Sequence, residues 1–193
     1  MEIFYKGLKL AIPRNVYHPA EDSFMLADAA YTAGKVLEVG CGCGIASLSW
    51  AKNNEVLGVD INPDAVKTSK DNAQKNNSKA EFIESDLFSK ISGKFDVILF
   101  NPPYLPTNEE DRVRGELNRA FDGGADGRAV LSRFLAIFAE YLEPNGSLFL
   151  VQSSLNGLEE TKSILEKQGF KTEIIDRQEF FFEKLFLIKA SKP

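Results

Sequence analysis

Short apolar runs that predict strands alternate with longer helical patterns along this chain, and this alternation constrains the fold more than any other feature. The runs that predict strands lie at residues 35–39, 55–59, 80–83, 95–100 and 147–152. The helical patterns lie at residues 45–52, 63–76, 127–142 and 157–168. Such alternation favours a parallel sheet with right-handed crossovers and helices on both of its faces.

The two ends of the chain add antiparallel elements to this core. Residues 3–12 predict a short hairpin, and residues 20–30 predict a helix with acidic residues in its first turn, where they suit the helix dipole. Residues 171–176 and 184–189 predict two strands with only a loop between them, so one of the two must run antiparallel. We therefore expect one domain over residues 1–193, with a Rossmann-like, seven-stranded, mostly parallel sheet that ends in an antiparallel hairpin. This sheet is typical of methyltransferases rather than of dehydrogenases.

Charge and cysteine content exclude several classes of function. The formal net charge is −5, which argues against a broad nucleic-acid surface because phosphate neutralisation usually requires excess Lys and Arg. No membrane-length apolar run or secretory leader is present, so we expect a cytoplasmic protein. Cys41 and Cys43 are too close for an unstrained disulfide and too few for a structural zinc site. We interpret them as small side chains that fill a tight loop, and we expect no metal.

A glycine-rich loop follows the first predicted strand in VLEVGCGCG and suggests a cofactor site. Gly40, Gly42 and Gly44 allow the backbone to turn sharply and to approach a ligand closely. Their spacing differs from the G-x-G-x-x-G of pyrophosphate binders, because Ile45 occupies the place of the third glycine. Glu38 is a poor neighbour for a pyrophosphate but a plausible one for the cationic end of a sulfonium amino acid. The loop therefore favours S-adenosylmethionine as the cofactor.

Acidic residues also follow the next two predicted strands. Asp60 can accept hydrogen bonds from both ribose hydroxyls, a role that does not distinguish NAD from S-adenosylmethionine. Asp86, with Leu87 beside it, lies where the cofactor's adenine is expected. Asp86 taken alone fits a turn-capping role equally well.

The tetrapeptide Asn101-Pro102-Pro103-Tyr104 follows the fourth predicted strand, whose end points toward the cofactor crevice. The Asn101 side-chain oxygen and the Pro102 carbonyl can each accept one N–H of a target NH₂ group. They would orient its lone pair and favour the charge that builds on nitrogen during methyl transfer. The prolines make the backbone rigid, and Tyr104 offers a flat surface for a planar amide or base. These residues predict N-methylation of a planar nitrogen.

NPPY together with the glycine loop resembles the amino methyltransferases, which include DNA adenine N6 and cytosine N4 enzymes, RNA guanine N2 enzymes and HemK-type glutamine methyltransferases. Residues 16–29, VYHPAEDSFMLADA, resemble the Y-x-P-x-E-D-[ST] segment of the eukaryotic and archaeal HemK-like branch. In that branch the segment covers the cofactor, which implies that Tyr17 and Ser23 lie beside S-adenosylmethionine and that residues 1–30 form a cover. Residues 121–135 resemble the family's GG-x-x-GR element, so that the resemblance runs over essentially the whole chain.

The resemblance implies an enzyme that methylates N5 of the glutamine in the Gly-Gly-Gln loop of class I peptide release factors. It also implies a small zinc-binding activator of the Trm112 type as a partner. Two alternatives remain open from the sequence. One is an adenine N6 or guanine N2 methyltransferase acting on DNA or RNA, because the tetrapeptide suits any planar NH₂. The other is a nucleotide-binding Rossmann module without enzymatic activity.

Four further features carry weaker predictions. We do not expect His18 to act as a general base, because the amide proton can leave after methyl transfer. Residues 107–119 are highly charged and fit either a solvated loop or a lid over the substrate. Arg128 at a helix start opposes the helix dipole, so we expect it to bind an acidic or polar group. Residues 180–182 are three phenylalanines that fit a sheet-edge cover or a partner surface, and core packing is the favoured interpretation.

Overall fold

The structure, a computed structural model, describes residues 1–104, 124 and 126–192. Its strands are β1 (Glu2–Tyr5), β2 (Leu8–Ala11), β3 (Lys35–Val39), β4 (Glu55–Asp60), β5 (Glu81–Glu84), β6 (Phe95–Phe100), β7 (Leu142–Ser153), β8 (Lys171–Glu179) and β9 (Lys184–Ser191). Its helices are α1 (Glu21–Asp28), α2 (Ile45–Trp50), α3 (Pro63–Lys75), α4 (Ala129–Ile137) and α5 (Leu158–Lys167), with 3-10 turns η3 (Phe138–Tyr141) and η4 (Ser154–Asn156).

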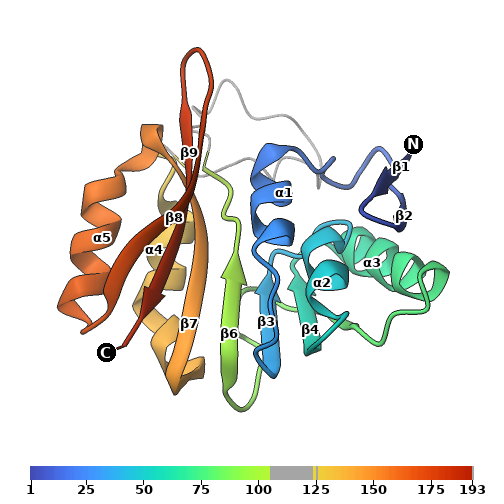
Figure 1. The fold of residues 1–193 in the computed structure, drawn as a ribbon, viewed down its shortest axis with the longest axis horizontal. Coiled ribbons are helices and arrows are strands. Elements are labelled where there is room, and N and C mark those ends of the chain that lie inside the picture. The colour runs from blue at the N-terminus through green and yellow to red at the C-terminus, as the bar shows by residue number, and fades with distance from the viewer. Residues whose placement is uncertain (105–123, 125, 193) are drawn as a thin grey trace.

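The main sheet has seven strands in the order β5-β4-β3-β6-β7-β9-β8 (Figure 1). β3 pairs in parallel with both β4 and β6, and β7 pairs in parallel with β6. β9 runs antiparallel to both of its neighbours, β7 and β8. The predicted Rossmann-like sheet with a C-terminal antiparallel hairpin is therefore confirmed.

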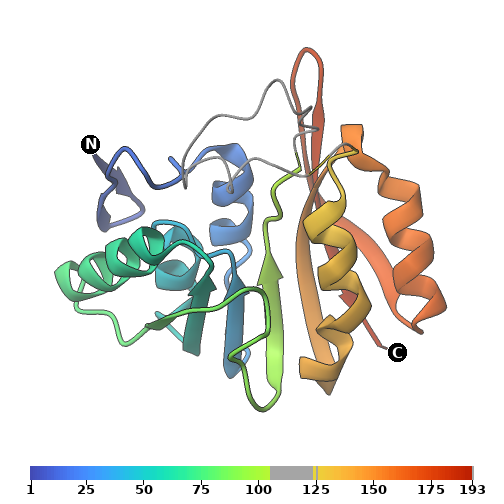
Figure 2. The same cartoon turned by 180° about the vertical axis from the view of Figure 1, so that it is seen from behind.

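Helices cover both faces of this sheet, as the parallel topology requires. Figure 1 shows α1 and α2 in front of the sheet, and Figure 2 shows α4 in front when the molecule is seen from behind. The first core contains buried side chains of α1, α2 and α3, among them Met25 and Leu48. The second core contains those of α4 and α5, among them Phe134 and Leu165. Because both faces are buried, the central strands are apolar on both sides.

The predicted elements lie where expected, and the largest differences concern lengths. The helix expected over residues 127–142 is α4 followed by η3, because the chain tightens into a 3-10 turn at its end, as helices often do. The strand expected over residues 147–152 begins at Leu142, which already pairs with Phe95 across a register irregularity. The last two strands extend to Glu179 and Ser191 because pairing continues through their polar ends.

The interpretation of residues 180–182 as core is wrong. Phe180, Phe181 and Phe182 are 42%, 91% and 84% exposed. They lie in the turn between β8 and β9, which projects beyond the sheet (Figure 1).

Two further expectations concern the charged segment at residues 107–119 and membrane-spanning helices. The charged segment at residues 107–119 lies outside the described residues, so neither interpretation of it is tested. In the part of the chain that the structure describes, no helix has the length and apolar character needed to span a membrane.

The N-terminal hairpin of β1 and β2 is fastened to the domain by two asparagines of α3. The fully buried Asn72 accepts from the Ala11 N–H at 2.9 Å and donates to the carbonyls of Ala11 and Cys43 at 3.1 and 3.0 Å. Asn76, one turn further, accepts from the Lys9 N–H at 2.9 Å and donates to the Lys9 carbonyl at 2.8 Å. The two amides act like a neighbouring strand, so this two-stranded hairpin, marginal in isolation, is held in place.

Replacing Asn72 with Ala should lower the free energy of unfolding by about 2–3 kcal/mol, because buried backbone groups of Ala11 and Cys43 lose their partner. The matched variant Asn76→Ala should cost about 1 kcal/mol or less, since water can replace the lost bonds at its more exposed site. Urea denaturation of both variants measures the difference. Equal losses in the two variants would contradict this account of the hairpin.

Candidate active site

The glycine loop after β3 adopts a backbone conformation that side chains disfavour. Gly40, Gly42 and Gly44 have φ values of +71°, +54° and +84°. A Cβ at Gly44 would also lie 3.1 Å from Ser69 Oγ. Non-glycine residues here would be strained, so the three glycines are explained by geometry. Cys41 and Cys43, between them, are buried free thiols, as their predicted loop-filling role requires.

The loop lines a pocket of about 380 Å³ at the carboxyl edge of the parallel strands, within the size range of small-molecule sites. Gly44 of the loop does not line this pocket, whereas twelve other predicted site residues do: Tyr17, Ser23, Glu38, Gly40, Gly42, Asp60, Asp86, Leu87, Asn101, Pro102, Pro103 and Tyr104. The structure thus brings together residues from five separate segments.

Glu38 is a buried carboxyl group held by the start of α2. Its Oε2 accepts from the Ser47 backbone N–H at 2.7 Å and from the Ser47 hydroxyl. Burial raises the pKa of Glu38 to about 8, although the hydrogen bonds from Ser47 lower it. The pocket therefore contains an acid that is uncharged near neutral pH when nothing cationic lies beside it.

Asp60 joins the glycine loop to the end of β4. Its Oδ2 accepts from the Gly42 N–H at 2.9 Å, and its Oδ1 accepts from the Asn62 N–H at 2.8 Å. Burial raises the pKa of Asp60, while these backbone hydrogen bonds oppose the rise. Because a carboxylate oxygen can accept more than one hydrogen bond, Asp60 can still accept hydroxyl donors from a ligand.

Asp86 and Leu87 lie at the pocket's margin after β5. Asp86 forms an ion pair with Arg133 of α4 at 2.8 Å, and both side chains are partly exposed. Leu87 has a φ of +48°, in the left-handed region that non-glycine residues seldom adopt. The Ser85 hydroxyl donates to the Leu87 carbonyl at 2.9 Å and helps to hold this conformation, which favours a specific role for Leu87 at the pocket.

Asn101, at the end of β6, presents an acceptor without a donor. Its Oδ1 is buried, and no group among residues 1–104, 124 and 126–192 donates a hydrogen bond to it. Buried polar atoms are nearly always paired, so an unpaired acceptor in a pocket indicates a ligand with N–H or O–H groups.

Asp22, in the first turn of α1, is a central polar residue of the pocket that was not predicted as a site residue. It is buried, and it accepts from the Tyr17 hydroxyl at 2.8 Å and the Tyr104 hydroxyl at 3.4 Å. Burial, followed by the charge of Asp22, raises the pKa of both tyrosine hydroxyls. Asp22 thus connects the N-terminal segment to the tetrapeptide. Its signal was its position in the Y-x-P-x-E-D-[ST] segment.

His18, unlike Asp22, does not line the pocket, although its neighbours Tyr17 and Pro19 do.

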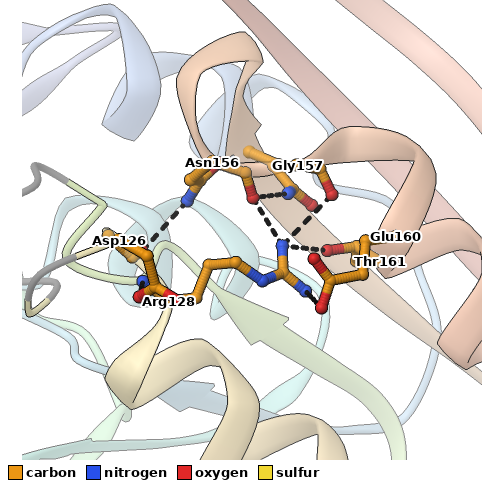
Figure 3. A network of polar contacts seen from close by, with 8 residues as sticks. Asp126, Arg128, Asn156, Gly157, Glu160 and Thr161 are labelled. Atoms are coloured by element: carbon orange, nitrogen blue, oxygen red, sulfur yellow. Dashed lines mark hydrogen bonds and ion pairs between the residues drawn. The ribbon is translucent and has the colours of Figure 1, made fainter.

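Arg128 binds polar groups, as expected, but they belong to this chain (Figure 3). The buried guanidinium donates from Nη1 to the carbonyls of Asn156 and Gly157 and to the Thr161 hydroxyl, the last two at 3.1 Å. Its Nη2 lies 3.3 Å from the carboxylate of Glu160. Arg128 therefore fastens the start of α4 to η4 and to the start of α5.

The residues that Arg128 connects also include one that packs against the Asn101–Tyr104 tetrapeptide. Asn156 donates to the Gly127 carbonyl at 3.3 Å. A Cβ at Gly127 would lie 2.4 Å from the Tyr104 carbonyl, and its φ of +71° also requires glycine. The segment that Arg128 anchors is thus packed directly against the end of the tetrapeptide.

This sheet order, with a glycine loop, buried acids and an unpaired amide oxygen at the carboxyl edge, defines a Rossmann-like methyltransferase. The family model described as "Methyltransferase small domain" matches residues 23–182, and the chain belongs to that family.

Individual relatives of known name add detail to this family assignment. The chain is 48% identical to a putative protein N5-glutamine methyltransferase of Methanocaldococcus jannaschii, over 98% of both chains. It is 32% identical to human methyltransferase HEMK2, over 85% of this chain and 84% of that protein. A chain of the E. cuniculi Mtq2–Trm112 complex, described as responsible for methylating the termination factor eRF1, superposes with a TM-score of 0.75 at 27% identity. That match covers 93% of this chain and 99% of the other. The resemblance to HemK-like methyltransferases is confirmed.

The raised pKa of Glu38 predicts a stability that depends on pH. Because the folded-state pKa of about 8 exceeds the ordinary value of 4.5, the stabilisation is fully present below pH 4.5 and is lost as the pH rises through 8. The variant Glu38→Gln, without ligand, should lose less stability than the parent chain between pH 5 and pH 8.5. Urea midpoints at several pH values measure this, and parallel curves for the two proteins would contradict it.

Removing the Arg128 guanidinium should destabilise the fold strongly. In Arg128→Met two carbonyls and a hydroxyl lose a buried donor, which should cost on the order of 2–4 kcal/mol of unfolding free energy. The control Glu160→Gln removes only the exposed member of the ion pair and should cost less than about 1 kcal/mol. Denaturant titration distinguishes the two, and a small loss in Arg128→Met would refute the anchoring role.

Proposed function

We propose that this chain transfers the methyl group of S-adenosylmethionine to N5 of the glutamine in the Gly-Gly-Gln loop of a class I peptide release factor. The observation that carries the proposal is the buried, unpaired Oδ1 of Asn101 in a pocket of a methyltransferase. A glutamine side chain presents an NH₂ group, which supplies the donor that this oxygen lacks.

The pocket's residues fit the proposed cofactor. S-adenosylmethionine supplies a methyl group on a positively charged sulfur. In this proposal Glu38 binds the cationic amino-acid end, and the protein backbone at Gly40 and Gly42 approaches the ligand closely. Asp60 accepts hydrogen bonds from the ribose hydroxyls. The remaining candidates complete the site: Asp86 and Leu87 beside the adenine, Tyr17 and Ser23 at the cover, and Asn101 beside the methyl group.

The tetrapeptide's proposed role is to prepare a weak nucleophile. An amide nitrogen delocalises its lone pair into the carbonyl, so it reacts poorly unless it is oriented and its developing charge is stabilised. Asn101 Oδ1 and the Pro102 carbonyl accept its two N–H groups, and Pro103 keeps the backbone rigid. Tyr104, whose hydroxyl is tied to Asp22, supports the flat face of the amide. The proton leaves to solvent after transfer, so no general base is required.

The names of similar proteins support a protein substrate. The relatives from M. jannaschii and human are named as a putative protein N5-glutamine methyltransferase and as HEMK2, and the Mtq2–Trm112 complex is described as methylating eRF1. Adenine and guanine also carry planar NH₂ groups. However, the net charge of −5 disfavours DNA or RNA as the substrate.

Three organisational features belong to the same proposal. Residues 1–193 act as a single domain in which residues 1–30 cover the cofactor, as the pocket-lining positions of Tyr17, Ser23 and Leu26 favour. A small zinc-binding protein of the Trm112 type serves as activator, by analogy with the E. cuniculi complex. Action on release factors implies a cytoplasmic location.

Asn101→Ala should lower kcat/KM for methylation of an intact release factor by about 10²–10³, the usual effect of deleting one transition-state hydrogen-bond partner. Cofactor binding should weaken much less. The assay supplies labelled S-adenosylmethionine and a Trm112-type partner, and maps the modified residue by mass spectrometry. The control Asn53→Ala changes an exposed asparagine outside the pocket and should leave the rate unchanged.

Two results would contradict the proposal. Label transferred to RNA or DNA but not to the release factor would refute the substrate assignment. Full activity of Asn101→Ala would refute the role of its amide oxygen.

A further inference from the structure

Two phenylalanines at the tip of the β8–β9 hairpin are exposed to a degree that folding does not explain. The rings of Phe181 and Phe182 are 91% and 84% exposed. Tight hairpin turns favour Gly, Asn and Asp, so this turn places two large aromatic residues where small polar ones are usual. Contiguous exposed apolar patches, unlike singly scattered apolar residues, mark contact surfaces on soluble proteins.

The topology places this tip at the pocket's edge of the sheet. β7 runs parallel to β6, β9 runs antiparallel to β7, and β8 runs antiparallel to β9. The turn from β8 to β9 therefore lies at the same edge as the carboxyl ends of the parallel strands, where the pocket is. Figure 1 shows the hairpin projecting beyond the rest of the sheet at this edge.

The turn lies within electrostatic range of the tetrapeptide. Glu183, the residue after Phe182, lies near enough to Tyr104 for its charge to raise the pKa of that hydroxyl, after burial and Asp22. The Lys184 N–H also donates to Ser154 Oγ in η4 at 3.0 Å, which fastens the residue that follows the turn to the end of β7.

The tip is organised before any partner binds. The Phe180 N–H donates to the Glu183 carbonyl at 2.7 Å and closes the turn. The Phe181 and Phe182 rings meet edge to face, with centroids 4.4 Å apart and an interplanar angle of 89°. Such an arrangement lowers the entropy cost of using the rings in binding.

We propose that Phe181 and Phe182 form the docking point for the protein substrate, inserting into an apolar depression beside the loop that carries the methyl-accepting side chain. This inference rests on the proposed function, because any protein whose side chain enters the pocket must approach this edge.

Charge at the tip favours a protein over a nucleic acid. Arg177 and Lys184, the cations that flank the turn, both pair with the Glu179 carboxylate, at 3.4 and 3.2 Å. Glu183 adds a further negative charge at the turn. Phosphate groups would therefore meet no uncommitted cation among these flanking residues, whereas an apolar protein surface needs none.

The test compares Phe181→Ser and Phe182→Ser, alone and together, with the parent chain in steady-state methylation of an intact class I release factor. The enzyme is used with its Trm112-type partner bound. Loss of an aromatic anchor should raise KM for the release factor about tenfold or more in the double variant. The kcat and the dissociation constant for S-adenosylmethionine should stay within about twofold, because neither ring lines the pocket.

Ile174→Ser is the control. Ile174 is 42% exposed in the middle of β8, away from the turn, and it does not line the pocket. Its KM should equal that of the parent chain. A KM that rises equally in Ile174→Ser would overturn the assignment, because exposed apolar side chains in general would then account for it.

The other outcomes of this test separate a failure of the docking role from a failure of the proposed function. An unchanged KM in the double variant, with methylation intact, overturns the docking role and leaves the proposed function standing. Size-exclusion loss of the activator from the double variant assigns the tip to that partner instead, and loss of a parent-chain dimer assigns it to a second copy. A parent chain that methylates nucleic acid and not the release factor overturns the proposed function and this inference together.

Discussion

Parallel pairing of β3 with β6 is the constraint on which the site depends. Val39 lies opposite Phe100 in this register, so the glycine loop and the tetrapeptide leave the sheet side by side although about 60 residues separate them in the chain. The crossover that makes these strands neighbours is the point where doubly wound sheets bind their ligands. The cavity and its lining follow from that adjacency, since the next loops, after β4 and β5, end at the same edge.

The pocket contains buried carboxyl groups and, in addition, a buried amide oxygen that lacks a hydrogen-bond donor among the described residues. Glu38, Asp60 and Asp22 are carboxyl groups in buried or nearly buried positions, and each is held by hydrogen bonds from its own chain. Such a site disfavours anions and favours a cationic ligand with hydroxyl groups. Asn101 adds a neutral, buried acceptor that lacks a donor among the described residues, and we propose that the substrate supplies this donor. The electrostatics of the pocket therefore agree with a sulfonium cofactor and an amide substrate.

Much of this could be predicted from the sequence because strand–helix alternation, glycine spacing and the NPPY tetrapeptide are local patterns. The partners of Arg128 could not, since its acceptors lie about 30 residues further on and are mostly backbone carbonyls. Asp22 was undervalued for a similar reason, because its contact with Tyr104 spans 82 positions. The apolar composition of residues 180–182 predicts burial, and only the length of the β8–β9 hairpin reveals that these rings lie beyond the sheet.

The central claim is that Asn101 Oδ1 accepts a hydrogen bond from the substrate amide. A crystal structure of the chain with the proposed Trm112-type activator, S-adenosylhomocysteine and a Gly-Gly-Gln-containing release-factor fragment tests it most directly. The account predicts that the glutamine side-chain nitrogen lies about 2.7–3.2 Å from Asn101 Oδ1, with its second N–H directed to the Pro102 carbonyl. A glutamine bound elsewhere, or an Asn101 Oδ1 paired with a protein group while the glutamine occupies the pocket, would contradict it.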